Sequence, residues 1–228
     1  TRSAAGELRR LAIIVAVFAS LWAIPVIAVV QILGAQPFAD VARLFTTAAF
    51  VTFGGAYAVL PYIAEAGVNT YSWLTPGEMI NGLALAETTP GPLILVTTYV
   101  GYFGGWNGGA AGLSPAAAGL MAALLTTYVT FLPSFMFIIA GAPYIERLQA
   151  LAWAKSALEA ITAAVVGVIL NLTVFLAKAV LIPGGGAVDW TAVAAGAVAF
   201  ALLASGRISV PWLVVIGAAF GLARVMVF

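Results

Sequence analysis

The sequence predicts an all-α, polytopic membrane protein, and three observations support this fold class. Hydrophobic residues make up 64% of the 228 residues, and the mean hydropathy is +1.13. Charged residues make up only 7%, whereas a soluble domain carries roughly 25%, so this chain needs lipid to cover its surface. The apolar residues are also gathered into runs of about 20, the length with which a helix crosses a bilayer.

Six continuous apolar runs are expected to be membrane spans. The first is too long for the apolar region of a secretory signal, and no convincing cleavage site follows it. Residues 1–10 are expected to form a cytoplasmic linker or amino-terminal tail, and residues 11–228 a transmembrane domain. Because the sequence starts at Thr1 rather than Met, we expect that residues were removed or that it is a segment of a longer chain. The six runs are residues 11–33, 41–64, 116–140, 157–181, 190–204 and 211–227.

A seventh apolar region, residues 75–105, is interrupted by a Thr-Thr-Pro-Gly-Pro sequence at residues 88–92. We predict two half-helices, residues 77–87 and 90–103, that meet at this interruption. Counted as one crossing, the region brings the total to about seven spans; a re-entrant hairpin is the alternative. Short loops are expected at the glycine pairs 104–105 and 108–109, and a short interfacial helix at residues 144–151.

The basic residues predict an orientation, because loops on the cytoplasmic side of a membrane carry an excess of Lys and Arg. Seven alternating crossings place the basic loops on the same side as the N-terminus. The N-terminus is therefore expected in the cytoplasm and the C-terminus outside. The basic residues gathered on the cytoplasmic side are Arg2, Arg9, Arg10, Arg147, Lys155 and Arg207.

Composition argues against several classes of function. The net charge is +1, from 9 Lys and Arg against 8 Asp and Glu, which lacks the basic patch of a nucleic-acid-binding protein. Cys and His are absent, which removes disulfides, thiolate chemistry and the usual zinc and haem ligands. No paired carboxylates occur at catalytic spacing. We therefore expect no enzyme activity and no cofactor, and any proton transfer falls to a carboxylate or a lysine.

Two interruptions of the apolar runs carry the candidate binding site. A Gly-Gly pair breaks the run at 41–64, and a Pro-Gly-Pro sequence breaks the region at 75–105. A helix that starts inside a bilayer exposes free N–H groups, which is tolerated where it lines a cavity or meets a ligand, and an anion is the natural ligand there. Packing glycines and a simple proline kink are the alternative. The residues expected to contact an anion are Gly54, Gly55, Ala56, Tyr57, Thr88, Thr89, Gly91, Leu93 and Ile94.

Glu87 is the most informative charged residue, because it lies beside the second interruption and is expected deep in the membrane. An intramembrane ionisable residue is a functional candidate, and burial would favour its protonated form, so we predict a coupling or gating role. A helix cap is the alternative. Arg43 is a second gating candidate, with interfacial snorkelling as its alternative. Thr97 and Thr98 supply hydroxyls after the interruption, where ordinary interhelical hydrogen bonds explain them equally well.

Several of these motifs together resemble the chromate ion transporters. The resemblance covers residues 40–180 and rests on the Gly-Gly-Ala-Tyr motif at 54–57, the Asn-Gly-Leu-Ala-Leu-Ala motif at 81–86 and the Thr-Pro-Gly-Pro motif at 89–92. Trp73-Leu74, Pro133-Ser134 and the Pro-Tyr-Ile-Glu-Arg-Leu sequence at 143–148 match in order. The resemblance implies export of chromate, with sulfate as a related substrate, across a bacterial or archaeal inner membrane.

The same resemblance implies an assembly. Members of this family carry two homologous, oppositely oriented halves, in one chain or in two. This sequence matches the carboxy-terminal half only, and we expect a partner half that is fused, a separate chain or a second copy. Protons are a possible further ligand. The alternatives are a permease or channel for another small anion, and a membrane enzyme or non-transporting accessory subunit.

Overall fold

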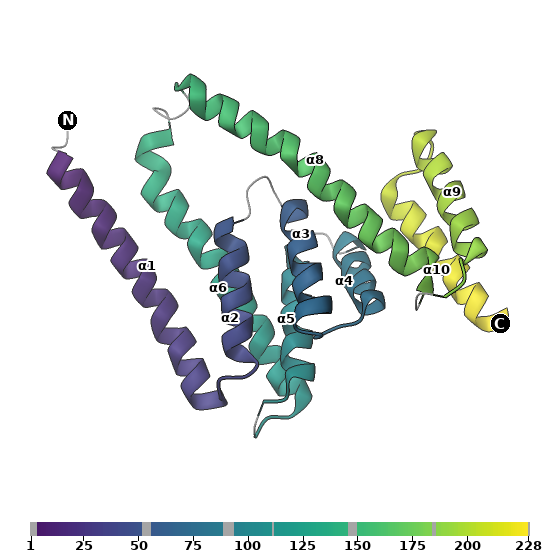
Figure 1. Cartoon of the computed structure of the whole chain (residues 1–228), viewed down its shortest axis with the longest axis horizontal. Helices are drawn as coiled ribbons and strands as arrows, with labels where there is room; N and C mark the ends of the chain where they lie inside the picture. Colours follow the sequence, from purple (N-terminus) through teal and green to yellow (C-terminus); the bar gives the residue numbers. More distant parts are fainter. Residues whose placement is uncertain are drawn as a thin grey trace.

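The computed structural model describes residues 4–51, 56–88, 94–110, 112–145, 150–183 and 186–227. Within these ranges the regular structure is entirely helical, as predicted (Figure 1). The helices are α1 (Ala4–Leu33), α2 (Phe38–Val51), α3 (Ala56–Glu65), the π-helix η1 (Ala66–Thr70), α4 (Pro76–Thr88), α5 (Leu95–Gly108), α6 (Pro115–Gly141), the 3-10 helix η2 (Ala142–Tyr144), α8 (Ala152–Leu181), α9 (Trp190–Ala204) and α10 (Val210–Val227).

Three helical segments of the described chain are long and apolar enough to cross a membrane. They are Ala5–Leu33, Pro115–Tyr144 and Ala152–Leu181, and they correspond to three of the predicted spans. The helix α1 begins at Ala4, so most of the expected amino-terminal tail is the first turns of this helix. The helices α9 and α10 are apolar but shorter, and they lie beside the end of α8, away from the other helices (Figure 1).

The predicted span at residues 41–64 is instead a helical hairpin. The chain runs along α2, reverses, and returns along α3 (Figure 1). It then repeats this course through α4 and α5, where Gly82 of α4 faces Tyr99 of α5. The second hairpin returns to the end at which it begins, because the side chain of Asn107, near the end of α5, donates a hydrogen bond to the backbone carbonyl of Trp73, just before α4, over 2.6 Å. The re-entrant alternative for residues 75–105 therefore describes this fold better than a crossing does.

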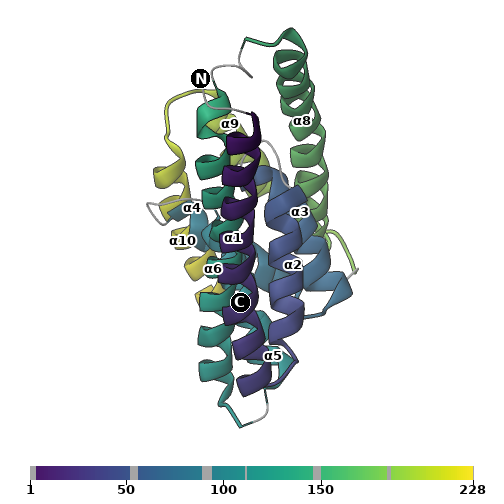
Figure 2. The same ribbon diagram turned by 90° about the vertical axis from the view of Figure 1, so that its left-hand side faces the viewer.

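The core lies between these two hairpins and α6. Its fully buried side chains include Phe38 and Phe45 of α2, Ile63 of α3 and Val100 of α5. The outer helices α1 and α8 turn mostly exposed apolar residues outward, as expected of surfaces that face lipid. Figure 2, turned by 90° from Figure 1, shows α1 lying across α6 with α2 at its side.

The helices α5 and α6 pack closely because α5 presents glycines to α6. A Cβ atom added to Gly105 would overlap the backbone carbonyl of Ala118, and one added to Gly101 would overlap the hydroxyl of Thr126. Small residues four apart allow two helix backbones to approach in a membrane. The prediction of a loop at Gly104-Gly105 is therefore wrong. The helix continues to Gly108, and Gly109 ends it with a φ of 69°.

Two helix starts, Thr75-Pro76 at α4 and Ser114-Pro115 at α6, follow the rule that a capping residue precedes a proline at the first helical position. The Glu78 carboxylate accepts hydrogen bonds from the backbone N–H of Thr75 over 2.7 Å and from its hydroxyl over 2.9 Å. The Thr75 hydroxyl in turn accepts from the backbone N–H of Glu78, which completes a capping box at α4. The expected interfacial helix at 144–151 is described only in part, because residues 146–149 lie outside the described ranges.

Candidate functional site

The start of α5 lies near the middle of the spanning helix α6. The hydroxyls of Thr98 and Thr127 share a hydrogen bond of 2.9 Å. Thr98 is in the first turn of α5, and Thr127 is the thirteenth of the 27 residues of α6. At 1.5 Å per residue α6 is about 40 Å long, so α5 begins about halfway along it. This is the depth at which repeat-built transporters place their binding sites.

The end of α2 lies at a similar height. The Tyr128 hydroxyl donates a hydrogen bond to the Leu21 carbonyl over 2.6 Å, and the indole of the next residue, Trp22, donates to the Thr46 hydroxyl over 2.8 Å. Thr46 and Tyr128 therefore both bond to the same turn of α1. From this height α2 has five more residues, the last of which is Val51, and α6 has four residues before Pro133. The end of α2, the start of α5 and the α6 proline thus lie at a similar height.

The structure places only part of the predicted site. Ile94 directly precedes α5, which begins at Leu95 rather than at Pro90. Tyr57 is in the first turn of α3 and is 41% exposed. Ala56 is the first residue of α3, and Glu87 and Thr88 are the last two residues of α4. Only the backbone is described for these three residues. The remaining predicted contacts lie outside the described residues: Gly54, Gly55, Thr89, Gly91 and Leu93.

Arg43 is not brought together with these residues. It is exposed on α2, eight residues before the end of this helix, which corresponds to about 12 Å along the axis. Its surroundings are the base of the hairpin, where burial and Asp40 raise the pKa of Tyr71 and Arg43 opposes them. Arg43 therefore belongs to the hairpin base, not to the region of the tips.

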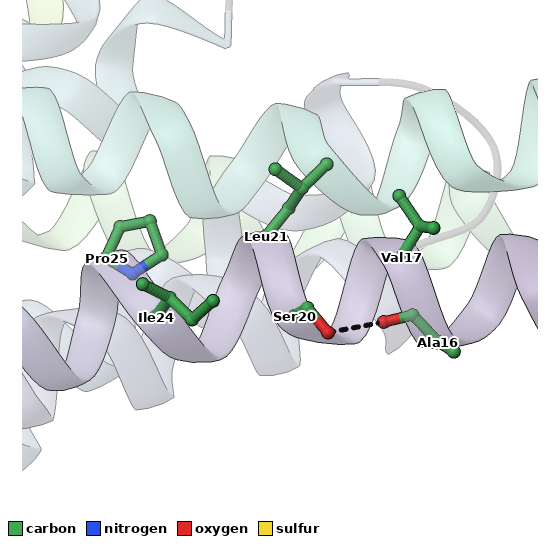
Figure 3. A pocket seen from close by; sticks show the side chains of 6 residues that line it. All are labelled: Ala16, Val17, Ser20, Leu21, Ile24 and Pro25. Carbon is green, nitrogen blue, oxygen red and sulfur yellow. Dashed lines mark hydrogen bonds between the residues drawn. The ribbon is translucent and has the colours of Figure 1, made fainter.

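Two of the cavities among the described residues are lined almost entirely by apolar side chains. One of about 570 Å³ lies between α1, α2 and α6, and its polar groups, Trp22 and Thr46, bind each other. A shallow groove on α1 contains Ser20, whose hydroxyl turns back onto the Ala16 carbonyl (Figure 3). Within the described ranges, no group of three His, Cys, Asp or Glu side chains that could hold a metal occurs. Neither cavity offers free donors to an anion.

Hydroxyl groups gather instead between α5 and α6. Thr97 donates to the Ile94 carbonyl over 2.6 Å, and Thr127 bonds both to Thr98 and to the Ala123 carbonyl. Thr126 and Thr130 are buried beside them. Sequence reasoning named the two threonines of α5 and missed the three of α6. The Thr-Thr-Tyr-Val-Thr sequence at 126–130, a polar run inside an apolar span, could have indicated them.

Comparison with known proteins agrees with the resemblance read from the motifs. A chromate transport protein from Pseudomonas aeruginosa is 33% identical over 173 residues, 73% of this chain and 37% of that protein. One from Cupriavidus metallidurans is 29% identical over 134 residues, 59% of this chain and 30% of that protein. An uncharacterised transporter from Methanocaldococcus jannaschii is 28% identical over 122 residues, 54% of this chain and 27% of that protein.

The matched part is a minor portion of these relatives, since the chain spans about a third of their length. No solved structure matches the chain. The family model of the chromate transporter matches residues 39–222, which include both helical hairpins, the spanning helix α6 and the threonines between α5 and α6. By this match and by the broken helices that it contains, the chain belongs to the chromate transporter family.

Proposed function

We propose that this chain is one half of a transporter that exports chromate, with sulfate as a related substrate, across a bacterial or archaeal inner membrane. The observation that supports it most is the position of the start of α5, about halfway along α6 and at a height similar to the end of α2. Discontinuous helices that meet near the middle of the membrane are a common way to build an anion site in transporters.

The proposed site binds the anion through backbone N–H groups at the starts of α3 and α5. Such groups are neutral, so an empty site is less costly than one built from buried arginines. Each net hydrogen bond to a charged group contributes about 1.5–3 kcal/mol. The proposed contacts are Gly54, Gly55, Ala56, Tyr57, Thr88, Thr89, Gly91, Leu93 and Ile94.

Glu87 is the proposed coupling or gating residue, because it lies in the last turn of α4, at the tip of the second hairpin. Export does not require protons, since moving one charge through 100 mV is worth about 2.3 kcal/mol and a dianion gains twice that. If Glu87 exchanges a proton during transport, Glu87→Gln flattens the pH dependence of chromate flux. An unchanged pH dependence in folded protein would remove this role.

The proposed partner is a homologous half of opposite orientation, as a fused domain, a separate chain or a second copy. Repeat-built transporters bind their substrate at the interface of the repeats, and this chain contains one Gly-Gly-Ala-Tyr and one Pro-Gly-Pro sequence. The N-terminus is proposed to lie in the cytoplasm. Chromate transport by this chain as a demonstrated monomer would exclude the partner.

Flux measurements in proteoliposomes test the function, with the membrane potential and the pH gradient varied separately. We expect saturable uptake of chromate, and of sulfate in competition with it. Gly55→Val and Gly91→Val crowd the backbone approach and weaken chromate binding by about ten- to a hundredfold, the loss of one hydrogen bond to a charged group. Thr97→Ala stays within a few-fold of wild type, because its hydroxyl already bonds to Ile94.

The same measurements separate the rival functions. A channel conducts without saturation or exchange, and a permease for another anion transports neither chromate nor sulfate. An accessory subunit binds no anion even when its partner is present. Equal and small effects of the three substitutions, in folded protein, would place the anion elsewhere.

A further inference from the structure

The threonine seam, as we name the cluster of Thr97 and Thr98 on α5 with Thr126, Thr127 and Thr130 on α6, contains two hydroxyls with no assigned partner. Thr126 is 0% exposed and Thr130 is 8% exposed. Neither side-chain oxygen has a hydrogen-bond partner among the described residues. Buried polar groups in proteins are nearly always paired, so two unpaired hydroxyls one helical turn apart require an explanation.

Other threonines of this chain show how a hydroxyl in a membrane helix is normally satisfied. Thr162 donates to the Leu158 carbonyl over 2.8 Å, and Thr173 donates to the Ile169 carbonyl over 2.9 Å, each four residues back along α8. Thr127, next to Thr126, bonds in the same way to Ala123. Thr126 and Thr130 make no such bond. Their donors remain available for a ligand.

The packing of α5 on α6 holds these hydroxyls near the start of α5. Gly105 faces Ala122, and Gly101 faces Thr126. The same step of four residues on each antiparallel helix places Thr130 opposite Thr97, in the first turn of α5. The two free hydroxyls thus form a line that runs along α6 toward the N-terminal end of α5.

We propose that Thr126 and Thr130 donate hydrogen bonds to the tetrahedral oxyanion as it passes along the seam, and that they contribute to its selection. This inference rests on the proposed function. A dianion of this shape accepts several hydrogen bonds at once, and neutral hydroxyls can donate them without adding a charge to the membrane interior. Both oxygens are closed off from solvent in this structure, so binding requires the first turns of α5 to separate from α6.

The test substitutes valine, which matches threonine in shape but has no hydroxyl, at Thr126 and at Thr130 of the complete transporter. Removing an unpaired buried hydroxyl leaves thermal stability unchanged or raises it. We expect each variant to raise the half-saturating chromate concentration about ten- to a hundredfold, the loss of one hydrogen bond to a charged group. Thr126→Ser and Thr130→Ser keep the donor and stay near wild type, and Thr162→Val on α8 is the matched control.

The outcomes are distinct. If Thr126→Val and Thr130→Val have the half-saturating chromate concentration of a wild-type protein that transports chromate, the proposed role of the threonine seam is wrong. The proposed function of the chain is then unaffected. A fall in stability that accompanies the loss of flux shows that the hydroxyls are bonded structurally, which also overturns it. Absence of chromate and sulfate flux in the wild-type protein overturns the proposed function itself, and the seam with it.

Discussion

A single side chain can supply a backbone hydrogen bond that a helix lacks, as Tyr128 does for the carbonyl of Leu21. Proline has no N–H group, so Pro25 inside α1 leaves the carbonyl of Leu21, four residues earlier, without its helical partner. The Tyr128 hydroxyl of α6 donates to this carbonyl over 2.6 Å. A gap made by one residue is thus filled by another that is 107 positions away in the sequence.

This pairing predicts a conditional effect of one substitution. Tyr128→Phe leaves the Leu21 carbonyl unpaired and lowers the free energy of unfolding by about 1–2 kcal/mol. Pro25→Ala restores an N–H donor within α1, so Tyr128→Phe in that background costs clearly less. Denaturant unfolding of the four proteins in detergent gives the coupling energy. An equal cost in both backgrounds would contradict the pairing.

At the scale of elements, α5 is a helix that packing stabilises against its own sequence. Four of its 14 residues are the glycines 101, 104, 105 and 108, and each glycine disfavours a helix by about 1 kcal/mol relative to alanine. Gly101 and Gly105 pack against α6, and their spacing of four residues is the small-residue spacing that brings membrane helices together. Gly104 packs against the ring of Trp73, and Gly108 packs against the side chain of Pro37.

The packing predicts that Gly105→Val separates α5 from α6. The added side chain meets the backbone of Ala118, which cannot move aside as a flexible side chain could, so we expect a loss of at least about 2 kcal/mol in the free energy of unfolding. Gly167→Val in α8 is the control, because an added Cβ atom there meets nothing within 4 Å. Similar stabilities of the two variants would show that the α5–α6 contact contributes little.

At the scale of the whole molecule, two hairpins that return to the side they entered replace two crossings. An even number of crossings is removed, so the side on which every later segment lies is unchanged. The two hairpins therefore leave the predicted side of Arg9, Arg10, Lys155 and Arg207 unchanged, and it stays a prediction. Arg10 of α1 donates to the Ile139 carbonyl at the end of α6 over 3.2 Å. What differs is the side of residues 66–75.

Single cysteines test this topology, because the chain contains no native cysteine. We expect an impermeant maleimide to label Ala35→Cys, Thr70→Cys and Gly112→Cys from one side of the membrane and Ala150→Cys from the other. All four are exposed positions outside the spanning helices. Seven alternating crossings would instead place Thr70 on the same side as Ala150, so the Thr70 result decides between the two folds.

Local composition and spacing predicted a large part of this protein. The membrane class, the three long spans and the two broken segments follow from apolar runs and from Pro and Gly, whose effects act within a few residues. The Gly-Gly and Pro-Gly-Pro motifs also pointed to the family that the comparison then established. The capping box at Thr75 and Glu78 was not predicted, although its residues are only three apart in the sequence.

Only the tertiary structure shows that the half-helices turn back and that the glycines of α5 are packing contacts. It also shows that the hydroxyls of Thr126 and Thr130 have no hydrogen-bond partner among the described residues. A half-helix has the same local pattern whether the chain continues across the membrane or turns back. Its course depends on contacts such as Thr98 with Thr127 and Asn107 with Trp73, which join residues 29 and 34 positions apart. No local preference encodes such contacts, because they depend on which helices become neighbours when the whole chain packs.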